Sequence, residues 1–479
     1  MRFMKANTVP KTIIQARQKK LALAIALAIA SSSASLSSLA ADPADQKTVI
    51  TATTAATHEN DLLTLYRQAA LSDPVFNSAK YSYLAGKEKL WQGFSVLTPQ
   101  IAAVGSETKN NLTKKGESEV QLKSRAWSVR LTQPLFNWDK WEQFRQGDLA
   151  ASIAEAQYAA AEQDLVLRVT EAYFNVLNAQ DTLNLARNKK TLIKEQLEQA
   201  KRNFEVGTAT ITGVRDAQAR FDLTNAQEIA AENDLRIKNL ALDLAVGQSN
   251  VKPKRLIDNS KLVDPPKESL ENWVSQSEVA SPAVRQAQFA LDIAKLEVDK
   301  AIAGHLPTLD GQIIYSGARN DSGTSTSPTN SLAGNHVLNP SANIVLSVPL
   351  FAGLATQYRV RETQFLEEKA RSDFENAKRT VAQNTRISYL GLISGLSQVK
   401  AYEAAEASTQ SALDANKLGY SVGVNINIDV LNAQSQLFQT KRDLAKARYD
   451  VLVGNLKLRQ AAGTLTPQDL QDINQLLAP

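Results

Sequence analysis

The hydrophobic pattern near the end of the chain has the period of a packed α-helix. Small and apolar residues recur there at alternating steps of three and four: Val430, Ala433, Leu437, Thr440, Leu444, Ala447, Val451, Gly454 and Leu458. This spacing places them on one face of a helix, along a seam that packs against another helix. Large and small residues alternate along the seam, so a neighbouring helix can approach closely at every second layer.

The same stretch occurs twice in the chain, at an offset of 216 residues. Val422–Gly423 corresponds to Val206–Gly207, and Gly463 corresponds to Gly247. The earlier seam starts at Val214 and is interrupted by two polar residues. Recurrence at a fixed spacing indicates a duplicated chain. We therefore expect two repeats, residues 60–247 and 270–463, joined by a linker over 248–269 and followed by a tail over 464–479.

Long helices are predicted inside the two repeats. Residues 135–252 and 350–466 contain no proline and carry a helical period. We predict two pairs of helices there: 138–205 with 214–246, and 352–418 with 429–463. Each repeat also opens with a shorter helical pattern, over 60–97 and 270–303, broken at Asp73-Pro74 and Ser281-Pro282 respectively.

Between the short and the long helices the period changes to two. Trp127, Val129 and Leu131 alternate with polar residues, and the second repeat carries the same alternation. A polar stretch interrupts each of these regions, 99–136 and 307–351. Each region therefore predicts a β-hairpin, with strands of about 9–11 residues, the length that crosses a bilayer at a tilt.

Helix lengths predict how the helices stack. A helix over 138–205 is roughly 100 Å long at 1.5 Å per residue. The helices over 214–246 and 270–303 contain 33 and 34 residues, so together they match its length. We expect these two to lie end to end along the long helix.

The same reasoning applies to the second long helix. There we expect 429–463 and 60–97 to stack end to end along 352–418. This arrangement brings the linker and both ends of the chain together near mid-length. It also places the strands at one pole and the tight turns of the helix pairs at the other.

Four strands are too few to close a barrel. A sheet with open edges would leave backbone N–H and C=O groups unsatisfied in lipid. If the strands enter a membrane, copies of the chain must therefore associate. Two copies would give eight strands and a barrel filled by side chains, whereas three would give twelve and an open lumen. Strand number alone does not choose between them.

The first 40 residues have the features of a secretory signal peptide. They carry six basic and no acidic residues, then a short apolar run, then small residues ending at Ala40. We expect residues 1–40 to be removed and 41–59 to form a flexible segment. The chain has 54 basic and 49 acidic residues, so without the signal 48 basic residues remain. This near-neutral balance gives no reason to expect a nucleic-acid partner.

Residues suited to catalysis or metal binding are sparse. The chain contains no cysteine, which excludes a cysteine-linked lipid and a thiolate metal site. Its three histidines, His58, His305 and His336, lie far apart and without metal-ligand spacing. We find no nucleophile motif and no phosphate-binding loop. We therefore expect no enzyme activity, no cofactor and no metal.

Several motifs together resemble the TolC family of outer-membrane export channels. The most specific is Tyr420–Gly423 followed by Ile428–Ala433. The others are the signal peptide, the hairpins entered at Pro99 and Pro307, the repeated Pro-Leu-Phe and the Val-Gly turns. The resemblance covers about residues 60–470.

The resemblance implies a mainly α-helical fold with a transmembrane β part. Duplicated helical hairpins would form a periplasmic α-barrel, and four strands per chain would join a shared trimeric β-barrel in the outer membrane. It also implies a periplasmic adaptor (membrane fusion protein) and an inner-membrane pump, either an ABC transporter or proton-driven. The channel would then be a passive conduit for secreted proteins or small toxic compounds.

The family places charged residues at the periplasmic mouth of its tunnel. Of two aspartates three residues apart, the first falls on Asp429 and the second on Asn432. An acidic residue of the first repeat falls on Gly213, and a basic residue of the second falls on Asn425, while Tyr420 is kept. The resemblance therefore implies a mouth that is less acidic than in those relatives.

Asp429 has two interpretations. Its position alone makes it a carboxylate in the first turn of a helix, where free N–H groups favour an anion. The resemblance adds a ring of three such carboxylates around a narrow lumen, which would favour cations. The two interpretations are compatible.

Four turn residues are candidates for contact with the adaptor: Gly207, Thr208, Gly423 and Val424. As plain turn residues, the two glycines supply positive φ angles. The resemblance adds that these turns form the surface that meets the adaptor.

Three tryptophans are candidates for the membrane interface, where aromatic residues gather: Trp127, Trp138 and Trp141. Packing between helices is the alternative for Trp138 and Trp141.

A second function from another class remains open at this point. The chain could be a periplasmic coiled-coil adaptor or structural protein, with its strands in a soluble sandwich. Strands of bilayer length joined by long polar loops at one pole favour the channel.

Overall fold

The computed structural model describes residues 61–112, 120–208, 210–257, 265–320 and 336–478. The expected signal peptide and the segment 41–59 lie outside the described residues. All of the described ranges belong to one unit of the chain, which begins at His58.

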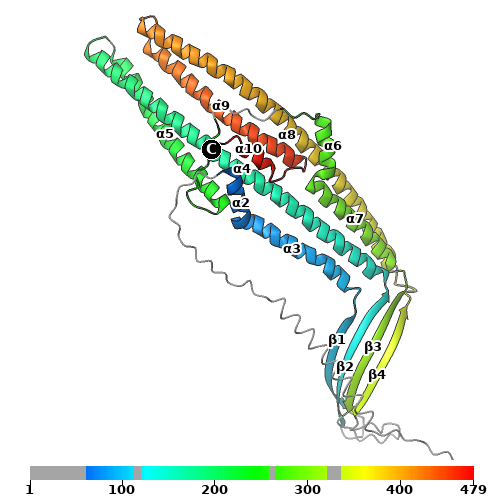
Figure 1. Ribbon diagram of the computed structural model, residues 1–479. Coiled ribbons are helices and arrows are strands. Elements are labelled where there is room, and N and C mark those ends of the chain that lie inside the picture. Colours follow the sequence, from blue (N-terminus) through cyan, green and yellow to red (C-terminus); the bar gives the residue numbers. More distant parts are fainter. Residues whose placement is uncertain (1–60, 113–119, 209, 258–264, 321–335, 479) are drawn as a thin grey trace, which may run out of the picture. The chain divides into compact units, whose positions relative to one another are not determined.

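Within the described residues, four strands form one antiparallel sheet in the order β1-β2-β3-β4 (Figure 1). The strands are β1 (Gln100–Leu112), β2 (Val120–Phe136), β3 (Thr308–Asn320) and β4 (His336–Ser347). They contain 12 to 17 residues, more than the expected 9–11. β2 of the first repeat pairs with β3 of the second, so the sheet joins the two repeats.

The register divides the side chains of the sheet into two faces, because paired residues point to the same side. Three consecutive register rows on one side carry uncharged, mostly apolar residues, and we call this side the apolar face: Ile101, Ala103, Gly105, Trp127, Val129, Leu131, Ile313, Tyr315, Gly317, Leu338, Pro340 and Ala342. The opposite side, the polar face, includes Arg130, Ser128, Ser316 and Asn339. A sheet with this contrast separates an apolar environment from an aqueous one.

The long helices are α4 (Trp138–Glu205) and α8 (Ala355–Ser421), and each turns back into α5 (Ile211–Val246) or α9 (Asn427–Ala461). α4 coincides with the expected 138–205. α8 begins three residues later than expected because Gly353 and Leu354 have positive φ angles of 61° and 67°, which a helix does not accommodate. Among the described helices, none has a stretch apolar and long enough to cross a membrane.

Shorter helices open each repeat. The first repeat has α2 (Leu62–Ser72) and α3 (Pro74–Ser95), and the second has α6 (Leu270–Ala280) and α7 (Pro282–Ala303). The breaks fall at the two proline positions that the sequence indicates. Proline lacks the N–H that the preceding helix would use but fits well as the first residue of the next helix.

The expected stacking of the short helices is wrong. α5 lies end to end with α2 and α3 along α4, and α9 lies end to end with α6 and α7 along α8 (Figure 1). The hydroxyl of Ser72 lies 2.5 Å from the carbonyl oxygen of Val246, which joins α2 to the end of α5. α2–α3 and α6–α7 each contain 11 and 22 residues. Helix lengths therefore could not tell which pair continues α5.

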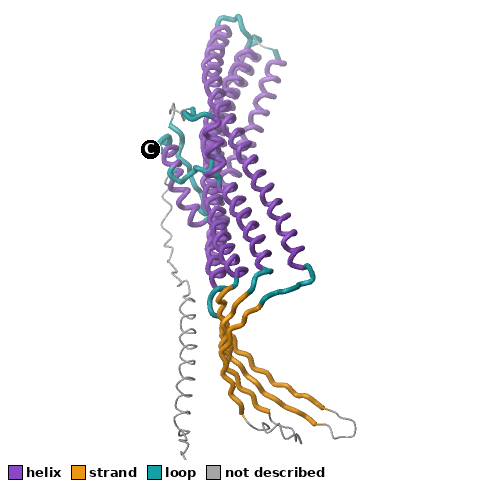
Figure 2. Tube along the Cα trace, turned by 90° about the vertical axis from the view of Figure 1, so that its right-hand side faces the viewer, coloured by secondary structure: helices purple, strands orange, loops and turns teal. Residues whose placement is uncertain are grey.

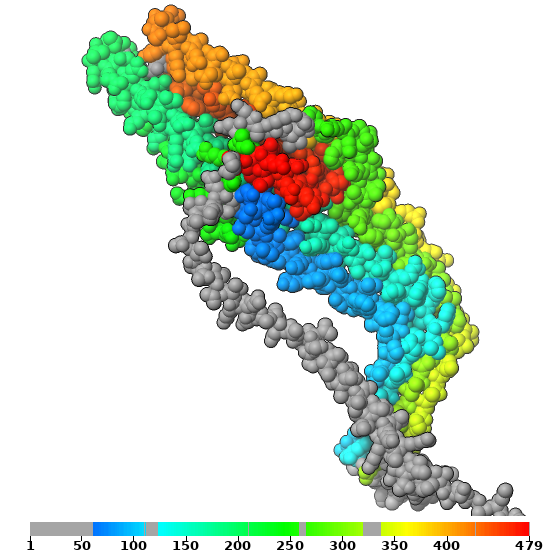
Figure 3. Space-filling model, viewed as in Figure 1, coloured from blue at the N-terminus to red at the C-terminus, as the bar shows by residue number. Residues whose placement is uncertain are grey.

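The linker and both described ends of the chain nevertheless meet near mid-length. Asn474, in α10 (Asp469–Asn474), donates its side-chain amide to Asp61 at 3.0 Å. Leu256 of the linker forms a β-bridge with Leu477. In the space-filling view the C-terminal segment (red) lies between α2 (blue) and α6 (green) (Figure 3). The tail thus belongs to the packed region at mid-length of the helices, which we call the waist.

The main hydrophobic core lies at this waist. It combines α2, the middle of α4, the end of α5, the end of α9 and α10, with buried members that include Leu62, Tyr173, Leu242, Leu452 and Leu470. Fully burying one such side chain contributes about 1.5–3 kcal/mol. The helices therefore depend on contacts between segments far apart in the sequence.

The seam from Val430 to Leu458 packs as its spacing predicts. Leu437, Leu444, Val451 and Leu458 are buried against α8. The Cα hydrogen of Gly454 faces Leu392 of α8, where a Cβ would lie 3.9 Å from the leucine methyl. An alanine side chain would therefore fit at this layer of the seam in ordinary van der Waals contact.

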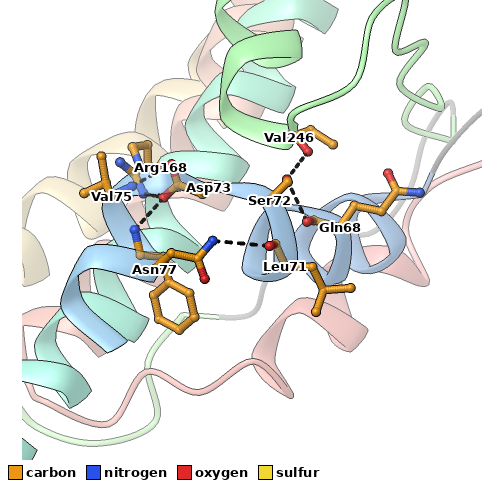
Figure 4. A network of polar contacts seen from close by, with 9 residues as sticks. Gln68, Leu71, Ser72, Asp73, Val75, Asn77, Arg168 and Val246 are labelled. Atoms are coloured by element: carbon orange, nitrogen blue, oxygen red, sulfur yellow. Dashed lines mark hydrogen bonds and ion pairs between the residues drawn. The ribbon is translucent and has the colours of Figure 1, made fainter. Parts of the chain in front are cut away.

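A polar network holds the joint between α2 and α3 (Figure 4). The buried Asp73 carboxylate accepts hydrogen bonds from the N–H groups of Val75 (3.4 Å) and Phe76 (3.0 Å) and pairs with Arg168 of α4. Asn77 donates to the carbonyl oxygen of Leu71 at 3.2 Å, across the same joint. At the matching joint of the second repeat, the Ser281 side chain makes no capping hydrogen bond.

We expect Asp73→Ala to lower the free energy of unfolding by about 2–3 kcal/mol, because it removes a helix cap and leaves Arg168 without its carboxylate. Ser281→Ala, at the matching joint, should change it by less than about 0.5 kcal/mol. Urea unfolding followed by circular dichroism measures both. Equal losses in the two variants would contradict a stabilising role for the Asp73 network.

Candidate tunnel mouth

The turn between α4 and α5 is closed by a glycine and two threonines. Gly207 has a φ of +78°, and the N–H of Thr208 donates to the carbonyl oxygen of Asn203 at 2.8 Å. Thr210 caps α5 by accepting from the N–H of Gly213 at 3.4 Å. Gly213 is exposed in the first turn of α5.

The turn between α8 and α9 has the same design. Gly423 has a φ of +79°, and the N–H groups of Val424 and Asn425 donate to the carbonyl oxygen of Gly419 at 2.9 and 3.1 Å. The Asn425 side chain donates to Asn416 of α8 at 3.0 Å. Asn425 is therefore held against its own hairpin.

Asp429 lies in the first turn of α9 and is half-buried. Its carboxylate accepts from the N–H of Ile426 at 3.2 Å, which is the helix-end role that its position predicts. Tyr420 packs against a small apolar cluster of Leu413, Val430 and Leu437. The ring rests on buried apolar groups of both helices of the hairpin.

Asn432 joins the two hairpins. Its side-chain oxygen accepts from Arg220 of α5 at 3.3 Å, and Arg220 also pairs with Asp216 at 3.0 Å. Sequence reasoning missed Arg220 and Asp216. The signal was available, because the repeat offset places Asp216 at the position of Asn432. The acid that the second repeat lacks there is present in the first.

A groove of about 450 Å³ runs between the hairpins behind these turns. α4 and α5 contribute Lys189, Gln227 and Asp234, and α9 contributes Phe438, Gln439 and Arg442. Burial, together with the positive charges of Arg442 and Arg220, lowers the pKa of Lys189. The groove therefore contains two cations, Lys189 and Arg442, and one carboxylate, Asp234.

The tryptophans lie at the other end of the helices. Trp127 is on β2, with its ring centroid 5.5 Å from that of Tyr315, and Trp138 and Trp141 are in the first turns of α4. All three are between 38% and 46% exposed. Trp141 also packs on Phe144, 5.7 Å between ring centroids. Membrane contact and helix packing are therefore both compatible with Trp141.

The structure brings the five candidate mouth residues and the four turn residues to one pole, away from the sheet (Figures 1 and 2). Gly207, Thr208 and Gly213 come from the first repeat, and the other six come from the second. Within the described residues, no group of three or more His, Asp or Glu could hold a metal ion.

Comparison with known proteins gives matches along most of the chain. The outer membrane efflux protein family model matches residues 65–248 and 273–464. The outer membrane protein TolC of Vibrio cholerae is 34% identical over 416 residues, 86% of this chain and 93% of that protein. The alkaline protease secretion protein AprF of Pseudomonas aeruginosa is 30% identical over 423 residues, 86% of each chain. The crystal structure of CusC superimposes with a TM-score of 0.72 at 19% identity, over 85% of this chain and 92% of that one, and shows the same fold.

We expect Arg220→Ala to speed amide hydrogen exchange at the start of α5, over residues 211–222, by about fivefold. The reason is that the lost link to Asn432 and Asp216 contributes roughly 1 kcal/mol to holding the helix tip. Arg215→Ala, at an exposed arginine more than one turn nearer the start of α5, is the matched control and should leave exchange within about twofold of the wild-type rate. Hydrogen-exchange mass spectrometry measures both. Similar acceleration in the two variants would show that Arg220 does not tie the hairpins together.

Proposed function

This chain belongs to the outer membrane efflux protein family, and from that membership we propose that it works as a homotrimeric channel in a three-component export system. It is an export channel of the outer membrane, as are its relatives. The proposal adds the trimer, the periplasmic adaptor and the inner-membrane pump. The energy for transport would come from the pump, and the channel would be a passive conduit.

The edges of the sheet carry the argument for several copies. Within the described residues, β1 and β4 each pair on one side only. In lipid the N–H and C=O groups on their free sides would cost several kcal/mol each unless another strand pairs with them. Pairing β4 of one copy with β1 of the next satisfies these groups. Three copies give twelve strands and an open lumen, whereas two give a barrel filled by side chains.

The two faces of the sheet fit this arrangement. The apolar face would meet lipid and the polar face would line the lumen. β2 continues for nine residues from Trp127 to Phe136, roughly 30 Å along the strand and about 21 Å across a bilayer at a 45° tilt, and Trp138 follows at the start of α4. We propose that these tryptophans, with Trp141, border the apolar band at its two interfaces.

Exposed apolar side chains between β4 and α8 and along the first turns of α8 also favour association. Leu350, Phe351, Tyr358 and Phe365 are 62% to 92% exposed in the single chain. Contiguous exposed apolar residues of this size mark interaction surfaces. A neighbouring copy would cover them while its helices extend the wall of the tunnel.

We assign adaptor contact to the hairpin turns at the opposite pole. Val206 and Val422, which flank Gly207 and Gly423, are 72% and 66% exposed, and Val424 is 80% exposed. These turns present apolar side chains and bent backbone to the periplasm. A partner with an apolar tip of its own would bury them.

In the alternative function, as a periplasmic adaptor, the strands would have to pack inside a soluble domain. A soluble sandwich needs a second sheet or a layer of helices over the apolar face. Within the described residues there is one sheet, and Ile101, Ile313 and Ile344 on its apolar side are more than half exposed. The exposed apolar face therefore favours the channel.

The trimer and its lumen are tested together on protein extracted from membranes in mild detergent. We expect native mass spectrometry to give the mass of three copies, and planar bilayers to show stable single-channel currents. Heating until the sheet unfolds should abolish both and serves as the control. A single copy, or a trimer that carries no current, would contradict the proposal.

We expect Asp429→Asn to reduce the preference of this current for cations, because it removes the charge from a ring of three carboxylates near the mouth. Asparagine keeps an oxygen that can accept from the N–H of Ile426, so the helix end is preserved. Asp429→Glu keeps the charge and should keep the preference. Reversal potentials in a salt gradient measure this cation preference. An unchanged reversal potential in Asp429→Asn would show that Asp429 does not line the lumen.

A further inference from the structure

One arginine on the polar face of the sheet is surrounded by uncharged positions. Arg130 of β2 pairs in register with Ala102 of β1 and Ile314 of β3. The six other positions that adjoin it on this face, along β2 and diagonally on its two neighbours, are also uncharged: Gln100, Val104, Ser128, Thr132, Gln312 and Ser316. Arg130 is exposed. Its charge therefore meets solvent rather than a carboxylate of the adjoining strand positions.

The height of Arg130 on β2 falls inside the part of the sheet that is proposed to cross the bilayer. It follows Trp127 by three residues and precedes Phe136, the last residue of β2, by six. These separations are roughly 10 Å and 20 Å along the strand. A charged side chain at such a depth is unfavourable against lipid and acceptable in a polar lumen. In the proposed barrel Arg130 therefore belongs to the lumen.

The polar face carries one other charge between the register rows of Ala126 and Pro134. Asp310 of β3 lies opposite Pro134, four residues along the strand from Ile314. Four residues correspond to roughly 13 Å along a strand. Exposed charges further apart than the Debye length, about 8 Å at physiological ionic strength, are largely screened from each other. The arginine and the aspartate would therefore act on passing ions at separate heights of the lumen.

We propose that Arg130 gives the strand-lined part of the channel a preference for anions. The inference rests on the proposed function, because three copies would place three Arg130 guanidinium groups at one level of the lumen. Rings of arginine or lysine favour anions in pores, as rings of aspartate or glutamate favour cations. The two poles of the channel would then have opposite preferences, since Asp429 is proposed to favour cations at the mouth. Solutes with carboxylate, sulfonate or phosphate groups would be attracted at the sheet end.

The first test compares the ion selectivity of wild-type and Arg130→Gln channels in planar bilayers. Near about 0.1 M potassium chloride we expect the ratio of chloride to potassium permeability to fall about twofold or more in the variant, because the ring loses its charge. Near about 1 M salt the change should shrink to less than about 1.3-fold, because the Debye length is then only about 3 Å. Reversal potentials in a salt gradient measure the ratio. An unchanged ratio at the lower salt concentration would overturn the proposal.

Two control variants separate charge from shape. Arg130→Lys keeps a positive charge at the same position and should keep the wild-type permeability ratio. Ser128→Ala lies two residues away on the same face, removes a polar group without changing charge, and should also keep the ratio. Equal falls in Arg130→Gln and Ser128→Ala would refute the proposal, because the shape of the lumen would then set the ratio.

The second test measures block of the wild-type current by a multivalent anion, inositol hexakisphosphate, added to one side of the bilayer. The polar helices remain on the side to which the protein is added, which identifies the sheet side. We expect half-block from the sheet side at a concentration at least about tenfold lower than from the turn side. Asp429→Asn, which removes charge at the turns, should keep the block from the sheet side, and uncharged inositol should not block. Equal potency from both sides, or no block, would contradict the proposal.

Two outcomes separate this inference from the proposed function. A wild-type trimer that conducts, with a permeability ratio that Arg130→Gln leaves unchanged, removes the anion preference alone. A protein that forms no conducting trimer removes the proposed function itself. If Arg130→Gln does not assemble, the one-sided block of the wild-type channel decides the question.

Discussion

Two helices of about 100 Å cannot each be covered by one partner of ordinary length, and this constraint shapes the helical part of the molecule. α4 and α8 are each covered by shorter helices that meet end to end at the waist. An end-to-end joint exposes helix termini, whose free N–H and C=O groups need partners. Asp73 and Ser72 supply them in the first repeat, and the C-terminal tail packs over the joint. The largest core therefore lies at mid-length.

The sheet faces a different constraint, the satisfaction of its edges. Its strands are long and its register is regular, with one irregularity between Pro134 and Phe136, where β2 approaches α4. Proline cannot donate to the ladder, so the break falls where the strand leaves the sheet. The rest of the sheet is a continuous surface with one apolar side, suited to an environment that a single soluble domain does not provide. Barrel formation by several copies is the proposal that we draw from that surface.

The two repeats share a plan but have diverged at their polar positions. The first repeat caps its helix joint with an aspartate that binds Arg168, and the second has Ser281 without a capping bond. Near the hairpin turns, Asp429 of the second repeat corresponds to Gly213 of the first, whereas Asn432 of the second corresponds to Asp216 of the first. The acids are thus distributed over both hairpins, and Arg220 connects them. A duplicated fold keeps its apolar seams because they form the core, while polar positions on its surface can specialise.

The sequence by itself determined the elements: the helix over 138–205, the breaks at the two prolines, the strand pairs and the packed face of α9. These follow from local rules, since periodicity and proline act within a few residues. The connections of the helix pairs also predicted that the turns lie at the pole opposite the strands. Only the tertiary structure decided which short helices continue α5 and α9, because α2–α3 and α6–α7 have equal lengths and either fits. It alone revealed the link from Arg220 to Asn432 and the uncharged surroundings of Arg130 on the polar face, because contacts between distant segments depend on register and packing rather than on local pattern.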